Sequence, residues 1–152
     1  MKIRIEIDEN LNPEEEVVVI KASSISEEVL ALQKALKETI GIEQKLALYK
    51  QERVFYLSLN ELLFFETEGG RVFAHTPEEM YEAQYRLYEL EELLPGYFMR
   101  ISKSTILNTR KVYSVSSSLP GARTAEFKGS YKQVYISRHY YKALQNKLEE
   151  TR

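Results

Sequence analysis

The sequence predicts an α+β fold in which an N-terminal β-β-α unit, residues 1–43, precedes a mostly-β region at residues 44–152. Three observations lead to this prediction. Apolar and charged residues alternate near the start of the chain, which indicates a strand. Pairs of short apolar runs flank polar or glycine turns further on, which indicates hairpins. Apolar residues also recur at helical spacing in three places, of which the last is residues 137–148.

The N-terminal unit combines two expected strands with one helix. Isoleucines alternate with charged residues over residues 3–7, and residues 17–20 form a second apolar run. Ser24 and Glu27 have the spacing of a capping box before a helix that Gly41 is expected to end. A chain of about 43 residues buries too little surface to be stable alone. We therefore expect this unit to pack on the rest of the chain or on a second copy, and favour a homodimer.

The second region begins with short strands. Polar residues 50–52 separate two apolar runs, and Gly69-Gly70 separates two more, so each pair is typical of a hairpin. Residues 98–108 are expected to form a strand that continues into a short helical turn at residues 104–108, and a further turn is expected at residues 119–121. The other strands expected in this region are residues 46–49, 53–57, 61–66, 71–75, 112–115, 125–128 and 134–136.

Two helices are expected in the second region. Thr76 and Pro77 provide an N-cap and a first-turn proline, apolar residues follow at helical spacing, and Pro95-Gly96 supplies a stop. The pattern therefore predicts an amphipathic helix at residues 76–94. Apolar residues at helical spacing also predict a C-terminal helix at residues 137–148.

The composition bounds the class of protein. The chain has no cysteine, which excludes disulfides and thiolate metal sites and fits a reducing compartment. No apolar run approaches the ~20 residues of a membrane helix, and the first residues do not resemble a signal peptide. We therefore expect a cytoplasmic protein.

Charge is distributed unevenly. The net charge is only -2, but residues 99–148 carry ten Lys or Arg and a single acidic residue, Glu126. A strongly basic third is the footprint expected of a surface that binds a polyanion. A solvated basic surface balanced by acidic neighbours is the alternative.

The residue content gives little support to catalysis. Only two histidines, His75 and His139, are available for acid/base or metal chemistry. No glycine-rich loop is followed by Lys-Ser or Lys-Thr in the phosphate-loop pattern. We therefore predict that the protein is not an enzyme and that it holds no cofactor and no metal.

Cations and hydroxyls of the basic third fall at expected turns and strand ends, where they can meet phosphates and bases. No helix-turn-helix is evident, so DNA would be bound by loops or strand ends. The candidate DNA-binding residues in this third are Arg100, Ser102, Lys103, Ser104, Lys128, Lys132, Ser137 and Arg138.

Residues 44–148 resemble a complete LytTR domain, a bacterial DNA-binding family. The resemblance is carried by Leu-Leu-Phe-Phe-Glu at residues 62–66, a basic residue after the following turn, the run from Phe98 to Asn108, and Ser137-Arg138. It implies small antiparallel sheets with few helices, and loops that enter the major groove of promoter DNA.

The family's base-reading positions correspond to three cations here, Arg71, Lys103 and Arg138. The serines Ser102 and Ser104 lie next to the second of these, and Ser137 next to the third, where the resemblance implies phosphate contacts. Ser102 stands where the family signature commonly has a histidine.

The resemblance also implies partners. About 43 residues in front of the domain are too few for a receiver domain, so the chain resembles a stand-alone transcription regulator. Such members are often restrained by a membrane protein, which makes an inhibitory membrane protein encoded nearby a candidate partner beside double-stranded DNA. The N-terminal unit would then dimerise or dock the inhibitor. The alternative function is a protein-interaction module whose basic face docks an acidic partner or a membrane surface.

Overall fold

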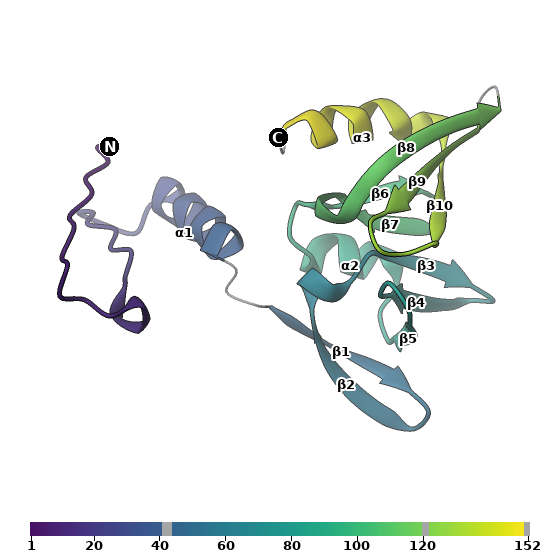
Figure 1. Cartoon of the computed structure of the whole chain (residues 1–152), viewed down its shortest axis with the longest axis horizontal. Helices are drawn as coiled ribbons and strands as arrows, with labels where there is room; N and C mark the ends of the chain where they lie inside the picture. The colour runs from purple at the N-terminus through teal and green to yellow at the C-terminus, as the bar shows by residue number, and fades with distance from the viewer. Residues whose placement is uncertain (41–43, 120–121, 151–152) are drawn as a thin grey trace. The chain divides into compact units, whose positions relative to one another are not determined.

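The computed structural model describes residues 1–40, 44–119 and 122–150. The chain divides into two compact units, residues 1–42 and residues 43–152. Figure 1 labels their helices and strands. The helix stop expected at Gly41 and the turn expected at Pro120-Gly121 lie outside the described residues.

The first unit contains the expected helix. After a short 3-10 turn, η1 (Pro13–Glu15), the chain forms α1 (Glu27–Ile40). The Ser26 hydroxyl caps this helix by accepting a hydrogen bond from the backbone N–H of Val29 at 3.2 Å. Ser26 is therefore the cap, and the capping role expected for Ser24 is wrong.

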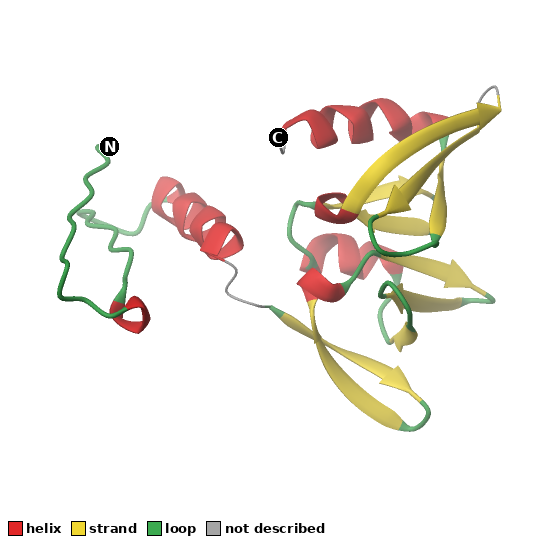
Figure 2. Cartoon of the chain, in the orientation of Figure 1, coloured by secondary structure: helices red, strands yellow, loops and turns green. Residues whose placement is uncertain are grey.

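The two strands expected in the first unit are absent, so the β-β-α description of residues 1–43 is wrong for the described part. Figure 2 shows residues 3–7 and 17–20 as loop. No backbone hydrogen bond joins the two segments within residues 1–40. Alternation makes a segment suited to a sheet, but a strand forms only where another strand offers a ladder, and an uncovered two-stranded ribbon is marginal in water.

The second unit is built on a seven-stranded antiparallel sheet with the order β2-β1-β5-β4-β3-β7-β6. Both expected hairpins, β1–β2 and β3–β4, are confirmed. The strands of this sheet are β1 (Lys45–Lys50), β2 (Arg53–Ser58), β3 (Phe64–Glu68), β4 (Arg71–His75), β5 (Met80–Ala83), β6 (Phe98–Ser102) and β7 (Thr105–Asn108).

A smaller antiparallel sheet with the order β10-β9-β8 and two helices complete the unit. The C-terminal helix, α3, confirms the expectation for the end of the chain. These elements are α2 (Leu87–Leu93), β8 (Val112–Leu119), β9 (Ala122–Phe127), β10 (Gln133–Ile136) and α3 (Arg138–Glu150), with 3-10 turns η2 (Leu59–Glu61) and η3 (Thr109–Lys111). The α+β class is confirmed, and no described helix is long and apolar enough to cross a membrane.

The amphipathic helix expected at residues 76–94 is only half correct. The Thr76 hydroxyl accepts from the Glu79 N–H at 3.0 Å, as an N-cap would. The chain then turns back as β5, which pairs with β4 in register from His75 opposite Met80 to Val72 opposite Ala83. A free sheet edge therefore outcompetes helix propensity in the first half of the segment. The second half, α2, is helical as expected.

The helical turn expected at residues 104–108 is also wrong. Residues 105–108 form β7, which hydrogen-bonds to β3 on one side and β6 on the other. All four β7 residues are buried. A central strand satisfies its backbone groups on both edges, which is the more favourable arrangement for an apolar segment buried on both faces.

Two hydrophobic cores lie on opposite faces of β3 and β7. Phe65 and Ile106 belong to the first core, which α2 covers with Leu90. Phe64 and Leu107 belong to the second, with Leu144 of α3 and residues of β9 and β10. Successive strand residues point to opposite faces. The adjacent pairs Phe64-Phe65 and Ile106-Leu107 therefore hold the large sheet between α2 and the smaller sheet.

Candidate nucleic-acid interface

The β6–β7 turn presents Lys103 at its tip. Ser102 is buried, and its hydroxyl accepts a hydrogen bond from the Ser104 N–H at 3.2 Å. Lys103 and Ser104 are exposed. The serine hydroxyl therefore closes the turn locally and leaves the lysine side chain on the surface.

The Arg100 side chain supports this turn by hydrogen bonds to its backbone. Its Nε donates to the Ser102 carbonyl at 2.9 Å, and an Nη donates to the Lys103 carbonyl at 2.6 Å. The other Nη forms an ion pair with Glu91 of α2. A guanidinium has donors in a rigid fork, so one side chain can hold two successive carbonyls and a carboxylate. The Arg100 guanidinium thus connects α2 to the backbone on either side of Lys103.

The β3–β4 hairpin ends beside the same turn. The Thr67 N–H donates to the Ser104 carbonyl at 2.9 Å, which fastens the end of β3 to the turn. Gly69 and Gly70 have φ values of +59° and +79°, as a two-residue hairpin turn requires. Arg71 follows with its side chain 67% exposed and its Nε 3.8 Å from Glu82 Oε1. The hairpin therefore projects an arginine close to the end of the sheet that carries Lys103.

The start of α3 also reaches this end. The Ser137 N–H donates to the Ile101 carbonyl at 2.9 Å, and the Ser137 carbonyl accepts from the Tyr141 N–H at 3.1 Å. The Ser137 hydroxyl is buried and has no hydrogen-bond partner in the described structure. Arg138, the first residue of the helix, is exposed. One backbone bond therefore places Arg138 next to the end of β6.

Six predicted site residues are thus brought to one end of the second unit, which we call the basic end: Arg71, Ser102, Lys103, Ser104, Ser137 and Arg138. They come from a hairpin turn, a second turn and a helix start, and backbone bonds from Thr67 and Ser137 join the three segments. Three exposed cations and the exposed Ser104 side chain can contact both phosphates and base edges.

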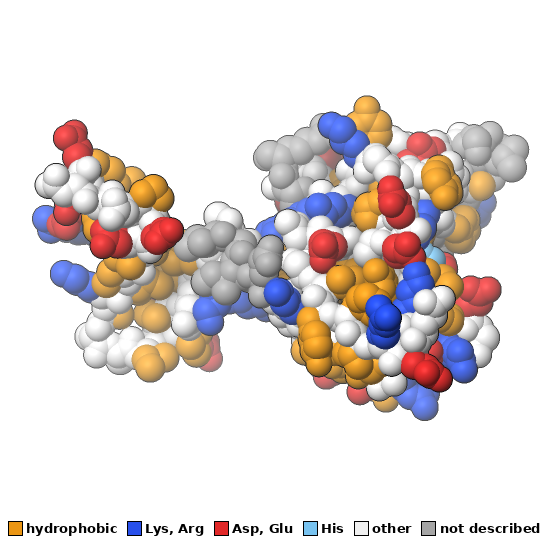
Figure 3. All heavy atoms as spheres, turned by 60° about the horizontal axis from the view of Figure 1, so that its bottom comes forward, with side chains coloured by type: hydrophobic (Ala, Val, Ile, Leu, Met, Phe, Trp, Pro, Cys, Tyr) orange, Lys and Arg blue, Asp and Glu red, His pale blue; other side chains and the backbone are white. Residues whose placement is uncertain are grey.

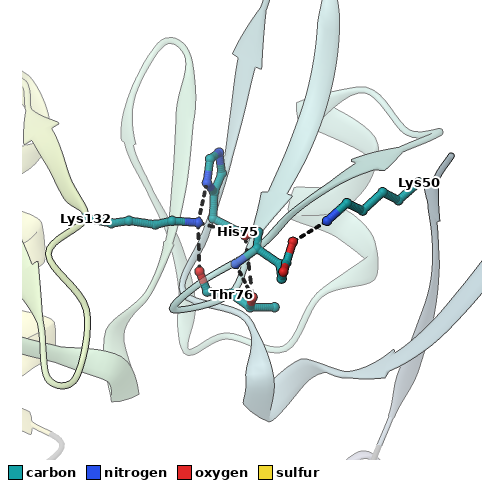
Figure 4. A network of polar contacts seen from close by, with 5 residues as sticks. Lys50, His75, Thr76 and Lys132 are labelled. Atoms are coloured by element: carbon teal, nitrogen blue, oxygen red, sulfur yellow. Dashed lines mark hydrogen bonds and ion pairs between the residues drawn. The ribbon is translucent and has the colours of Figure 1, made fainter.

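Lys132 lies elsewhere and is engaged within the protein (Figure 4). Its Nζ donates to the Thr76 carbonyl at 2.9 Å and to the Glu79 carbonyl at 2.7 Å, and lies 3.1 Å from His75 Nδ1. Lys50 pairs with the carboxylate of Glu79 from the other side. Lys132 therefore fastens the β9–β10 loop to the β4–β5 turn. His75 and Arg71 are at opposite ends of β4, which puts this network roughly 13 Å from the basic end.

His75 is uncharged at neutral pH. Burial, together with the neighbouring Lys132 ammonium, lowers the pKa of His75 to about 4. Burial also lowers the pKa of Lys132 and raises the pKa of Glu66 from their ordinary values. Glu66 Oε1 lies 2.8 Å from His75 Nε2, but outside the direction of the ring N–H, so the pair is a close contact and not a well-formed hydrogen bond. His75 also stacks on Phe64 with ring centroids 4.3 Å apart.

Lys128 is exposed at the start of the β9–β10 loop and lines a surface hollow of about 820 Å³ together with Lys111 and Glu78. It belongs to the Lys132 end of the unit, so the structure does not bring these two lysines together with the basic end. No group of three or more His, Asp or Glu side chains in the described residues is arranged to hold a metal ion.

Two contributors to the site were missed in the sequence. Glu91 of α2 pairs with Arg100 across the Pro95-Gly96 break. Arg123 stands opposite Ile136, next to Ser137, and stacks on the Tyr141 ring at 3.6 Å. Neither pairing has a local sequence signal, because each depends on strand register or on how a helix packs.

A protein-family model described as the LytTr DNA-binding domain matches residues 52–149. Relatives include proteins of Staphylococcus aureus that are named HTH-type transcriptional regulators. One from strain COL is 27% identical over 148 residues, covering 97% of this chain and 98% of the relative. One from strain MW2 is 26% identical with the same coverage.

Among solved structures, a LytTr DNA-binding domain from Bacillus cereus matches with a TM-score of 0.64 and 18% identity, covering 70% of this chain and 97% of that chain. This likeness shows the shared fold. In the described residues α2 and α3 are separated by five strands, so they do not form a helix-turn-helix.

Proposed function

Because this chain belongs to the LytTr DNA-binding domain family, we propose that it is a sequence-specific transcription regulator that inserts the loops of its basic end into the major groove of promoter DNA. One observation carries the proposal: three segments far apart in the sequence converge with exposed Arg71, Lys103 and Arg138 at their tips. The major groove, about 12 Å wide, admits protein elements of this size and displays a distinct pattern for each base pair.

The residues of the basic end divide by chemistry. Arg138 and Arg71 carry planar guanidiniums, which can bond a guanine with two parallel hydrogen bonds, and Lys103 can contact the same acceptors singly. The exposed hydroxyl of Ser104 suits a phosphate oxygen. The Ser137 hydroxyl is buried, so this residue contributes through its backbone, which fixes the start of α3 next to β6.

Two of the predicted DNA-binding residues act indirectly in this proposal. The Arg100 guanidinium binds the turn carbonyls and the Glu91 carboxylate, so Arg100 orients Lys103. The Lys132 ammonium donates hydrogen bonds to the β4–β5 turn, so Lys132 positions the loop that carries Lys128. Lys128 itself is exposed and is proposed to contact a phosphate outside the groove that the basic end enters.

The proposal places the protein in the cytoplasm, with double-stranded DNA as its ligand and neither cofactor nor catalysis as part of its action. A homodimer would bind paired sites, since joining two modest modules raises the effective affinity without new contacts. An inhibitory membrane protein that binds the N-terminal unit remains a proposed partner. The absence of any buried residue in positions 1–39 supports an interaction role for that unit.

The test is selection of DNA from a random pool by the purified full chain, followed by binding measurements on the selected site and on scrambled DNA. Arg138→Ala is expected to cost about 1–3 kcal/mol on the selected site and to relax preference at one base pair, with little change on scrambled DNA. Lys128→Ala is expected to weaken both DNAs similarly and to lower the salt slope by about one unit.

Lys147→Ala is the matched control, because it removes a cation from the same helix as Arg138 but roughly 13 Å away along its axis. Equal losses on both DNAs for Arg138→Ala would refute its role as a base reader. Failure to enrich any sequence would refute DNA recognition and favour a basic face that docks an acidic protein or a membrane surface.

A further inference from the structure

The first seven residues are chemically suited to a strand but have no strand partner. Ile3, Ile5 and Ile7 are 94%, 79% and 83% exposed. Figure 3 shows hydrophobic side chains of the N-terminal unit open to solvent. Within residues 1–40, no backbone hydrogen bond reaches residues 1–7. Exposed isoleucines beside unpaired backbone groups form a strand edge that another chain can pair with.

The charged residues between the isoleucines indicate which chain would pair with this strand edge. Reading along the segment, Lys2 and Arg4 are basic and Glu6 and Asp8 are acidic. If a second copy lies antiparallel with Ile5 as the centre, Arg4 faces Glu6 of the second copy and Lys2 faces its Asp8. In a parallel, in-register pair every charge would face its own kind, and like charges directly opposite are destabilising.

The isoleucines also match one another when two copies pair antiparallel about Ile5. Ile3 faces Ile7 of the second copy, and Ile5 faces itself, so all isoleucines lie on one face of the paired strands and all charges on the other. Within one chain Arg4 and Glu6 lie 2.9 Å apart with side chains 85% and 75% exposed. Such an exposed pair contributes little, so its two charges are available to a second copy.

The isoleucine face also has apolar side chains available to cover it. Ile5 and Ile7 line a hollow of about 830 Å³ with Leu11, Val17 and Val19. Val17, Val18 and Val19 are 77%, 61% and 67% exposed. Ordering residues 2–8 against a second copy would therefore place their isoleucines beside exposed valines of the same unit, which favours burial of both.

We propose that the chain forms a two-fold symmetric homodimer in which residues 2–8 pair antiparallel with residues 2–8 of a second copy, with Ile5 on the symmetry axis. The occupant of this edge is a second copy because a segment with equal numbers of basic and acidic residues in this order is complementary to itself. Under this pairing, the residues that the sequence predicted to be a strand become one in the dimer.

The test uses the full chain and measures mass by sedimentation velocity over a concentration series. Arg4→Glu and Glu6→Arg each place like charges opposite one another at two symmetric positions, and each is expected to raise the dimer dissociation constant roughly tenfold or more. The double variant with both changes restores opposite charges and should dimerise like the unmodified chain. An equimolar mixture of the two single variants should form a heterodimer.

Lys34→Glu, which reverses an exposed charge on α1 of the same unit, is the control and should leave the dimer intact. Three results would overturn the proposal: a monomer at every concentration, single variants that dimerise as well as the unmodified chain, or single variants whose defect is restored neither in the double variant nor in the mixture. The last result would show that Arg4 and Glu6 do not face each other across the dimer.

Engineered cysteines test the register independently, since the chain contains none of its own. Residues directly opposite in an antiparallel pair have Cα atoms about 4.5–5.5 Å apart, within the range a disulfide accepts. Ile3→Cys and Ile7→Cys should therefore cross-link with each other on mild oxidation. Neither should cross-link with itself, because like positions are roughly 14 Å apart. Self-linking by Ile3→Cys without linking to Ile7→Cys would refute the antiparallel arrangement.

Discussion

Replacing Lys132 with methionine should destabilise the second unit without removing any of the cations of the basic end. Methionine keeps most of the aliphatic length of lysine but cannot donate hydrogen bonds. It would leave the carbonyls of Thr76 and Glu79 and the Nδ1 atom of His75 without the ammonium that they share. The β9–β10 loop would then lose its attachment to the β4–β5 turn, apart from the hydrogen bond from the Ser130 hydroxyl to the Pro77 carbonyl at 2.9 Å.

The expected magnitude follows from these contacts. A hydrogen bond from a charged group contributes about 1.5–3 kcal/mol, and Lys132 makes two to backbone carbonyls and a third contact to the ring. Burial lowers the pKa of the ammonium, which shows that its desolvation offsets part of the gain. The Thr76 and Glu79 carbonyls are near enough to the surface to recover water. We expect a net loss of about 2–3 kcal/mol, or roughly 8–12 °C in Tm for a unit of this size.

The assay is thermal unfolding of the full chain followed by near-ultraviolet circular dichroism, which reports tyrosine packing in the second unit. Lys128→Met is the control, because it removes an exposed lysine from the same loop. A Tm for Lys132→Met within a degree of that control would show that the contacts contribute nothing to stability. A stable Lys132→Met variant with equally weakened binding to every DNA would instead assign the lysine to phosphate contact.

Three further predictions concern stability. His75 has a pKa of about 4 in the folded chain and near 6.5 in the unfolded chain, so the unfolded chain binds more protons between these values. The free energy of unfolding should therefore fall as the pH is lowered from 6.5 to 4, by at most about 3 kcal/mol. His75→Gln should remove this part of the pH dependence, as measured by urea titrations at several pH values. Gly70→Ala should cost about 1 kcal/mol, since φ is +79° there, whereas Gly96→Ala, with no positive φ, should cost little. Asn108→Leu should cost about 2–4 kcal/mol, because the fully buried amide donates to the Leu62 carbonyl at 2.9 Å and accepts from a backbone N–H.

Each of these three predictions has a result that would contradict it. Identical pH profiles for His75→Gln and the unmodified chain would show that His75 does not titrate in this window. Equal stability of the two alanine variants would mean that the hairpin turn relaxes without strain. An Asn108→Leu variant as stable as the unmodified chain would show that water or a local shift satisfies the freed carbonyl.

The hairpins and the terminal helix could be predicted because their signals are local. Gly69-Gly70 supports the positive φ angles of a tight turn, and the runs on either side pair with each other without help from distant residues. The C-terminal helix has its apolar residues at helical spacing. The hydrogen bond from the Arg110 N–H to the Asn108 side-chain oxygen is also local, because a short amide commonly binds a backbone group two residues away. The bond from the Asn108 amide to the Leu62 carbonyl joins residues far apart in the sequence and has no local signal.

The segments that were predicted incorrectly depend on partners far away in the sequence. Residues 80–83 form a strand because β4 offers an edge, and residues 105–108 form one because β3 and β6 lie on both sides. The strand predicted at residues 3–7 is absent for the opposite reason, because no neighbouring strand is present within residues 1–40. A strand is a property of a pair, so its residues alone cannot guarantee it.

Family membership and the list of candidate cations came from the amino-acid sequence, because charge content and short motifs are carried by neighbouring residues. The grouping of those cations came from the tertiary structure. The bonds from Thr67 to Ser104 and from Ser137 to Ile101 bring Arg71, Lys103 and Arg138 to one end. The same packing directs Lys132 and Arg100 inward, toward carbonyls that no local pattern reveals. The sequence specifies the charge of each side chain, but only the packing of the sheets decides whether that side chain faces solvent or a neighbouring carbonyl.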